Sequence, residues 1–159
     1  MNWWKEFKPK SCSVSLRGGS KEEVLQEILG VLVKSDQLSA ELQERAFQAL
    51  VDREQLASTG VGMNVAIPHV KLPGLEKAIC SLGIHPGGAE WDAVDGAPVK
   101  ILFTVLRPAE AGELHDPEQH LEMMRWIAKL GRDVDFRNFA IHAKTKKELV
   151  DLLKEKRTV

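Results

Sequence analysis

Apolar and polar positions divide the chain into a helical part, a strand-rich part and a second helical part. Apolar residues recur three and four apart over residues 20–33 and again after Ser39. This spacing predicts two consecutive amphipathic helices that form a helical hairpin. Ser20 and Glu23 are typical of a capping box at the first of them. A short strand over residues 13–16 is predicted before the hairpin.

Three strand candidates follow the hairpin. Residues 64–67 form a short apolar run, which Pro68 should end because proline cannot donate to a sheet ladder. Residues 78–84 alternate between apolar and other side chains, which indicates a strand with one apolar face. Residues 99–106 are almost entirely apolar, as is typical of a strand covered on both faces.

The last third of the chain returns to helical spacing. One helix is predicted from its N-cap Asp116 to Gly131, which should end it. A shorter helix is predicted over residues 135–143, with Phe139 on its apolar side. Thr145 is the predicted N-cap of the final helix.

Helices before and after a mostly buried group of strands predict an α/β fold, with a central mixed β-sheet flanked by helices on both faces. The 159 residues suit one domain. This domain is predicted over residues 12–159, after an N-terminal tail of residues 1–11. Trp3 and Trp4 of the tail bind a partner, fold back over the edge of the core, or are simply mobile.

Composition excludes several classes of function. The formal net charge of −1 supplies no field that would favour nucleic acid or an anionic membrane. No apolar run reaches the length of a membrane span, and the first residues lack the apolar core of a signal peptide. We therefore expect a cytoplasmic protein. Cys12 and Cys80 lie too far apart in sequence for a C-x-x-C motif, so neither a disulfide framework nor a zinc knuckle is predicted.

Two of the five histidines are candidates for chemistry. His69 follows a strand and Pro68, so a stiff backbone should present its imidazole at the carboxyl end of the strand, where open α/β sheets place their ligands. Such an imidazole is neutral about half the time or more near pH 7, and neutral imidazole is a good nucleophile. The alternative is a histidine that only hydrogen-bonds a loop.

His120 falls in the first turn of a predicted helix and shares a face with Met124 and Ile127. Helix starts carry free N–H groups and a partial positive charge, which stabilise an anion. Alternatively, His120 is a hydrogen-bonded core residue. The other histidines are expected in loops or on the surface: His85, His115 and His142.

Competing kinds of site find little support. His115 and His120 are five residues apart, which does not stack them on one helix face, and no cysteine or acidic cluster completes a metal site. There is no G-x-S-x-G elbow for a serine hydrolase and no phosphate-binding G-x-x-x-x-G-K-[ST] loop. Neither a metal nor a cofactor is predicted.

Residues 53–69, "REQLASTGVGMNVAIPH", resemble the active-site signature of enzyme IIA of the mannitol/fructose class in the bacterial phosphoenolpyruvate-dependent phosphotransferase system. The nitrogen-regulatory IIA proteins belong to the same class. The matching features are the acid Glu54, the small residue Gly62, and an apolar–Ala–apolar–Pro–His run that ends at His69. "EWDAVDGAPVKILFTVLRP" and "HLEMMRWIAKLGRD" resemble later parts of the family, and the likeness extends over residues 12–157.

The resemblance implies that His69 accepts a phosphoryl group from the histidine-containing phosphocarrier protein. His69 would then pass it to a cysteine of a IIB domain or use it as a regulatory signal, as a component without independent turnover. His120 would hydrogen-bond the phosphoryl oxygens, with Arg53, Ser58 and Thr59 as further candidate donors. The alternative for these three is a charge that complements a helix end and two ordinary turn hydroxyls.

The sequence departs from the family pattern in two places. Met63 and Asn64 interrupt a region that is often glycine-rich, and Val70 stands where a small residue usually follows the histidine. Val70 is expected to narrow access to His69. Two alternatives remain: a non-catalytic regulatory binding module of the same fold, and a degenerate member that binds without accepting phosphate. No IIB domain or permease segment accompanies the chain, which favours a stand-alone regulator and membrane contact only through a permease.

Overall fold

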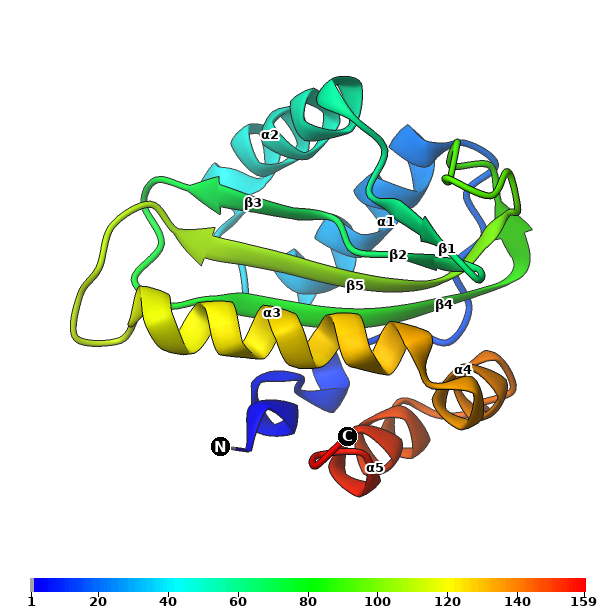
Figure 1. Cartoon of the computed structure of the whole chain (residues 1–159). Helices are drawn as coiled ribbons and strands as arrows, with labels where there is room; N and C mark the ends of the chain where they lie inside the picture. The colour runs from blue at the N-terminus through cyan, green and yellow to red at the C-terminus, as the bar shows by residue number, and fades with distance from the viewer. Residues whose placement is uncertain (1) are drawn as a thin grey trace.

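The structure, a computed structural model, describes residues 2–159 (Figure 1). The predicted helices and the strand candidates at 64–67, 78–84 and 99–106 appear in the predicted order, whereas strands over residues 60–62 and 69–72 were not predicted. The 3-10 turns are η1 (Trp3–Glu6), η2 (Pro9–Ser11) and η3 (Ala40–Leu42). The α-helices are α1 (Lys21–Lys34), α2 (Gln43–Leu56), α3 (Pro117–Arg132), α4 (Val134–Ile141) and α5 (Lys146–Glu155). The strands are β1 (Gly60–Gly62), β2 (Val65–Ala66), β3 (His69–Leu72), β4 (Ile79–Ala89) and β5 (Val99–Pro108).

The helical hairpin begins as its sequence predicts. The Ser20 hydroxyl accepts the backbone N–H of Glu23 at 3.2 Å, and the Glu23 carboxylate accepts the N–H of Gly19 at 3.4 Å. The capping box is therefore present, with its return bond moved one residue outward. Ser39 caps the 3-10 turn η3 rather than α2, which starts after this turn.

The central strand of the sheet is β5. Strands β2 and β3 both run parallel to β5 along one side, β4 pairs antiparallel on the other side, and β1 pairs with β2. Val65 pairs with Ile101 and His69 pairs with Val105. The two pairs are four residues apart on both sides of the ladder, so β2 and β3 pair with β5 in one continuous register.

The strand before Pro68 stops as predicted, at Ala66, but pairing with β5 resumes at His69 in a strand that the sequence did not predict. The missing N–H of proline costs the ladder one donor, while the Pro68 carbonyl still accepts the N–H of Val105 at 2.9 Å. The result is a short interruption in which the backbone of Ile67 is free to bond elsewhere.

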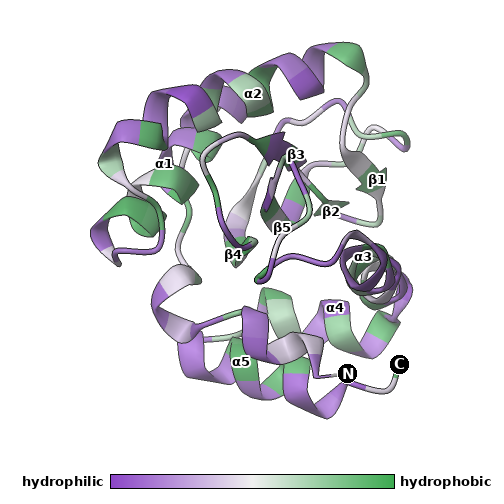
Figure 2. Cartoon of the chain, turned by 90° about the vertical axis from the view of Figure 1, so that its left-hand side faces the viewer, coloured by the Kyte–Doolittle hydropathy of each residue, from purple (hydrophilic) through white to green (hydrophobic). Residues whose placement is uncertain are grey.

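Each face of the sheet carries its own apolar core. Ile101, Phe103 and Val105 pack with buried side chains of α3, α4 and α5. Leu102 and Leu106 pack on the other face with those of α1 and α2. Figure 2 shows the two helical layers on opposite sides of the sheet. The predicted α/β fold, a mixed sheet with helices on both faces, is confirmed.

Some local predictions are wrong because contacts across the fold override local signals. Residues 13–16 form a single parallel bridge, between Ser13 and Gly83, instead of a strand. Helix α3 ends at Arg132, one residue past Gly131, and a Cβ on Gly131 would stand 3.4 Å from Val65, so the glycine also allows close packing of helix on sheet. Phe139 is 67% exposed.

The segment predicted as a tail folds back onto the α3–α5 side of the core. Phe7 is buried there, and Trp3 and Trp4 pack against the same cluster. Of the alternatives for the tryptophans, folding back over the core is the one observed. Within residues 2–159, no helix combines the length and apolarity needed to cross a membrane.

Candidate functional site

The interruption of the ladder at Pro68 frees the backbone carbonyl that determines the tautomer of His69. Nδ1 of His69 lies 2.6 Å from the carbonyl oxygen of Ile67. A carbonyl oxygen only accepts, so the neutral ring carries its proton on Nδ1 and donates it to Ile67. The lone pair is then on Nε2, the nitrogen that remains available for chemistry.

His120 approaches the same face of the sheet from the first turn of α3 and is partly buried. Burial is the main cause that lowers the pKa of His120 to about 4. The charges of Arg107, His115 and His69 act in the same direction, which places all three near its ring. His120 is therefore neutral at pH 7, with the centroid of the His115 ring 5.4 Å from its own.

Arg107 was missed in the sequence because its place depends on strand register. His69 pairs with Val105, and Lys71 pairs with Arg107 two residues further on. Side chains two residues apart share a face, so Arg107 lies on the face of His69. The sequence does show an arginine directly after the apolar run 99–106. Only the register between β3 and β5 links this arginine to His69.

Two histidines expected in loops or in solvent are buried. His85 lies within β4, is 6% exposed, and its Nε2 is 2.8 Å from the carbonyl oxygen of Gly18. His115 is also 6% exposed and faces the His120 ring edge to face, with 5.4 Å between ring centroids. The expectation holds for His142, which is exposed at the C-cap of α4.

The three candidate donors are engaged in backbone and network contacts. Nη1 of Arg53 donates to the carbonyl oxygen of Ala57 at 2.6 Å, at the end of α2. The Ser58 hydroxyl donates to the carbonyl oxygen of Trp91 at 2.9 Å, and the Thr59 hydroxyl donates to a buried carboxylate. Their role as phosphoryl donors stays a prediction, since each would first have to exchange its present partner.

The acid of the signature, Glu54, organises the segment that leads to β1. Its carboxylate is 9% exposed and accepts the N–H of Thr59 at 3.0 Å, the Thr59 hydroxyl, and Nε1 of Trp91 at 3.0 Å. Nζ of Lys21 lies 3.5 Å from its other oxygen. These contacts tie the end of α2 to the loop before β1 and to the residue that starts the W-D motif.

Glu54→Gln should lower the free energy of unfolding by about 2 kcal/mol. The amide keeps the shape of the side chain, but it replaces one acceptor oxygen by a donor that faces other donors, and it removes the charge paired with Lys21. Urea denaturation measures the change. Gln55→Ala, at an exposed neighbour, should stay within about 0.5 kcal/mol of the unsubstituted protein. Equal stabilities of the two variants would contradict the role of the Glu54 carboxylate in holding the segment before β1.

Neither departure from the family pattern touches the imidazole of His69. Met63 and Asn64 both have positive φ, 57° and 67°, and form the two-residue turn between β1 and β2. Asp95 accepts the N–H of Met63 at 2.9 Å and stabilises this turn. At about 3.3 Å per residue, the turn is more than about 13 Å along the strand from His69. Val70 packs into the core on the α1–α2 side, the face opposite His69, so it does not narrow access.

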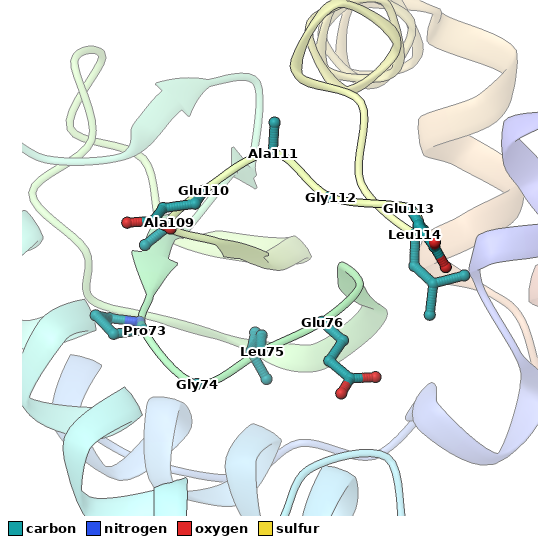
Figure 3. Close-up of a pocket in the computed structure, with 10 residues that line it drawn as sticks. All are labelled: Pro73, Gly74, Leu75, Glu76, Ala109, Glu110, Ala111, Gly112, Glu113 and Leu114. Carbon is teal, nitrogen blue, oxygen red and sulfur yellow. The ribbon is translucent and has the colours of Figure 1, made fainter.

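Two hollows lie beside the carboxyl ends of β3 and β5. One, of about 630 Å³, lies between Pro73–Glu76 and Ala109–Leu114 (Figure 3). Its carboxylates make it unsuited to a phosphoryl group: Glu76, Glu110 and Glu113. The other, of about 380 Å³, is lined by both His115 and His120. Three lysines, Lys5, Lys8 and Lys77, and two carboxylates, Glu6 and Asp116, also line it.

Acid should destabilise the protein partly through His120. The folded pKa of about 4 lies below the unfolded value of about 6.5, so the unfolded chain takes up the proton first. Stability present above pH 6.5 is therefore lost as the pH falls towards 4. Between pH 7 and 5, we expect His120→Gln to lose about 1–2 kcal/mol less than the unsubstituted protein, in urea denaturation. Equal losses would mean that folded His120 titrates normally.

Comparisons with known proteins agree with this arrangement. The family described as "Phosphoenolpyruvate-dependent sugar phosphotransferase system, EIIA 2" matches residues 6–156. A nitrogen regulatory protein of Pseudomonas aeruginosa is 35% identical over 145 residues, which cover 91% of this chain and 90% of that protein. A fructose-specific EIIA component of Haloferax volcanii is 30% identical over 136 residues, covering 86% and 84%.

Solved structures show the same fold. The Nitrogen Regulatory Protein IIA-Ntr of Neisseria meningitidis has a TM-score of 0.79 at 27% identity, covering 94% of this chain and 97% of that one. The IIA of an Escherichia coli mannitol IIA–phosphorylated IIB complex has a TM-score of 0.69 at 19% identity, covering 92% and 96%. The match over residues 6–156 spans both the helical hairpin and the helix of His120, and the chain therefore belongs to the EIIA 2 family of the phosphoenolpyruvate-dependent sugar phosphotransferase system.

Proposed function

We propose that the chain carries a phosphoryl group on Nε2 of His69, accepted from the histidine-containing phosphocarrier protein. The observation that carries this proposal is the bond between Nδ1 of His69 and the Ile67 carbonyl, which leaves Nε2 as the nucleophile. Membership of a phosphotransferase-system family supports the carrier role.

The transfer exchanges one nitrogen–phosphorus bond for another. The lone pair on Nε2 of His69 attacks phosphorus, the N–P bond of the donor phosphohistidine breaks, and its electron pair returns to the donor imidazole. The proton on Nδ1 stays in its bond to the Ile67 carbonyl throughout. No metal or cofactor is needed, because phosphoryl transfer depends mainly on positioning and on stabilising charge.

The surroundings of His69 suit the charge that arrives. A phosphoryl group brings roughly −1.5 to −2 charges at neutral pH. Arg107 supplies a permanent positive charge on the same face, and His120 supplies a ring N–H at a helix start, where the dipole also favours an anion. Both groups lie on rigid elements, β5 and α3, so side-chain rotation is enough to bring them to the phosphoryl oxygens.

Two destinations for the group follow from the relatives. The mannitol IIA of Escherichia coli is described in complex with phosphorylated IIB, which supports transfer to a IIB cysteine. The relative from Pseudomonas aeruginosa is named a nitrogen regulatory protein, which supports a regulatory use of the phosphorylated state. In either role the protein is an intermediate without turnover of its own.

The test is reconstitution with phosphoenolpyruvate, enzyme I and the phosphocarrier protein. We expect an acid-labile mass gain of one phosphoryl group in the intact chain, visible by mass spectrometry at neutral pH. No gain would reject the carrier function and leave a non-catalytic binding module. A stable gain that no IIB domain removes would favour regulation, whereas rapid loss to a IIB domain would favour sugar uptake.

A further inference from the structure

His115 is a buried imidazole at the edge of the site to which the proposed function gives no role. It is 6% exposed, although Leu114 before it is 62% exposed. Two backbone bonds with Gly112, of 3.0 and 3.2 Å, close the turn that ends at His115. The next residue, Asp116, is the N-cap of α3. The ring is thus fixed where the loop from β5 meets the helix that carries His120.

One nitrogen of this ring is unsatisfied. Within residues 2–159, the buried Nε2 of His115 has no hydrogen-bond partner. Buried polar atoms nearly always have a partner, and an exception calls for an explanation, such as a role that is completed only in another state of the protein.

The ring of His120 lies near enough to supply a partner for Nε2 of His115. The rings of His115 and His120 have centroids 5.4 Å apart and planes at 65°. Two imidazoles joined by an N–H···N hydrogen bond have ring centres about 5 Å apart, given a donor–acceptor distance of about 2.9 Å. A modest rotation of the His120 ring, without movement of the backbone, would therefore join them.

We propose that His115 is a positioning residue for His120 in the phosphorylated protein. When His120 turns to donate to a phosphoryl oxygen on His69, its other ring nitrogen accepts Nε2–H of His115. This bond fixes the tautomer of His120, because the nitrogen that accepts from His115 cannot carry the proton. The proton of His120 then points at the phosphoryl group. The inference rests on the proposed function of His69 and adds a residue to it.

The test compares His115→Phe with His115→Gln in the full chain. Phenylalanine fills the space without a donor, whereas the glutamine amide can still donate. We expect His115→Phe to slow the transfer of the phosphoryl group from His69 to a IIB domain about 10-fold, with acceptance nearly unchanged, and His115→Gln to recover most of the rate. The melting temperature of His115→Phe should not fall, because the variant removes an unsatisfied buried nitrogen.

Ring ¹⁵N NMR of the phosphorylated protein supplies a second readout. One His120 nitrogen should be protonated and the other unprotonated in the unsubstituted chain, and His115→Phe should mix the two tautomers. His85→Phe is the matched control: His85 is equally buried with an unpartnered Nδ1, but it lies near Gly18, and we expect unchanged transfer.

The possible outcomes separate the two proposals. Unchanged transfer in His115→Phe, or slow transfer with an unchanged His120 tautomer, would overturn the role of His115 alone. Failure of the unsubstituted chain to take up any phosphoryl group would instead reject the carrier function on which that role rests.

Discussion

His69→Ala takes up no phosphoryl group when phosphoenolpyruvate, enzyme I and the phosphocarrier protein are supplied. The variant lacks Nε2 of His69. Because Nδ1 donates its proton to the Ile67 carbonyl, Nε2 is the nitrogen with a free lone pair for attack. Because the bond to phosphorus cannot form at all, we expect complete loss rather than a slower rate. Intact-protein mass spectrometry at neutral pH measures the gain.

His142→Ala is the matched control for the loss of a histidine. His142 is exposed at the C-cap of α4, and its Nδ1 lies 2.8 Å from the carbonyl oxygen of Asn138, so its removal should leave phosphorylation unchanged. Full mass gain in His69→Ala would mean that another residue carries the group and would reject this assignment. A melting temperature close to that of the unsubstituted chain would show that the loss is chemical.

His120→Ala should still accept the phosphoryl group but pass it on about 10²–10³-fold more slowly. Arg107 remains on the same face to hold the incoming charge, which preserves acceptance. Onward transfer requires the charge on the oxygens to be stabilised as the bond to His69 loosens, and the variant lacks the neutral imidazole that would donate there. Rapid-quench measurement of transfer from phosphorylated protein to a IIB domain gives the rate.

Gln119→Ala controls for changes at the start of α3. Gln119 is an exposed neighbour of His120 in the same first turn, and we expect its loss to change the transfer rate by less than about 3-fold. Onward transfer at the normal rate in His120→Ala would remove the proposed role of His120. It would leave Arg107 as the principal charge that holds the phosphoryl group.

Local sequence signals predicted the helices well because helix caps and apolar periodicity act over neighbouring residues. Ser20 and Thr145 are N-caps as expected, each accepting the N–H of a glutamate three residues later. Predictions failed where the local structure depends on contacts with a segment far away in the sequence. Helix α3 runs one residue past Gly131, to Arg132, and the sequence did not reveal β3, which pairs with β5 beyond Pro68.

The sequence predicted the helices, three of the strands, their order and the two histidines that the family resemblance singled out, but not β1 or β3. What it could not supply is contact between residues far apart in the chain. Arg107 joins His69 only through strand register, His115 meets His120 only because the turn at Gly112 folds under α3, and Val70 points away only because side chains alternate across β3. The pattern over residues 60–70, "GVGMNVAIPHV", indicates that His69 takes part in chemistry. The tertiary structure determines which nitrogen of His69 is free and which charges lie on its face of the sheet.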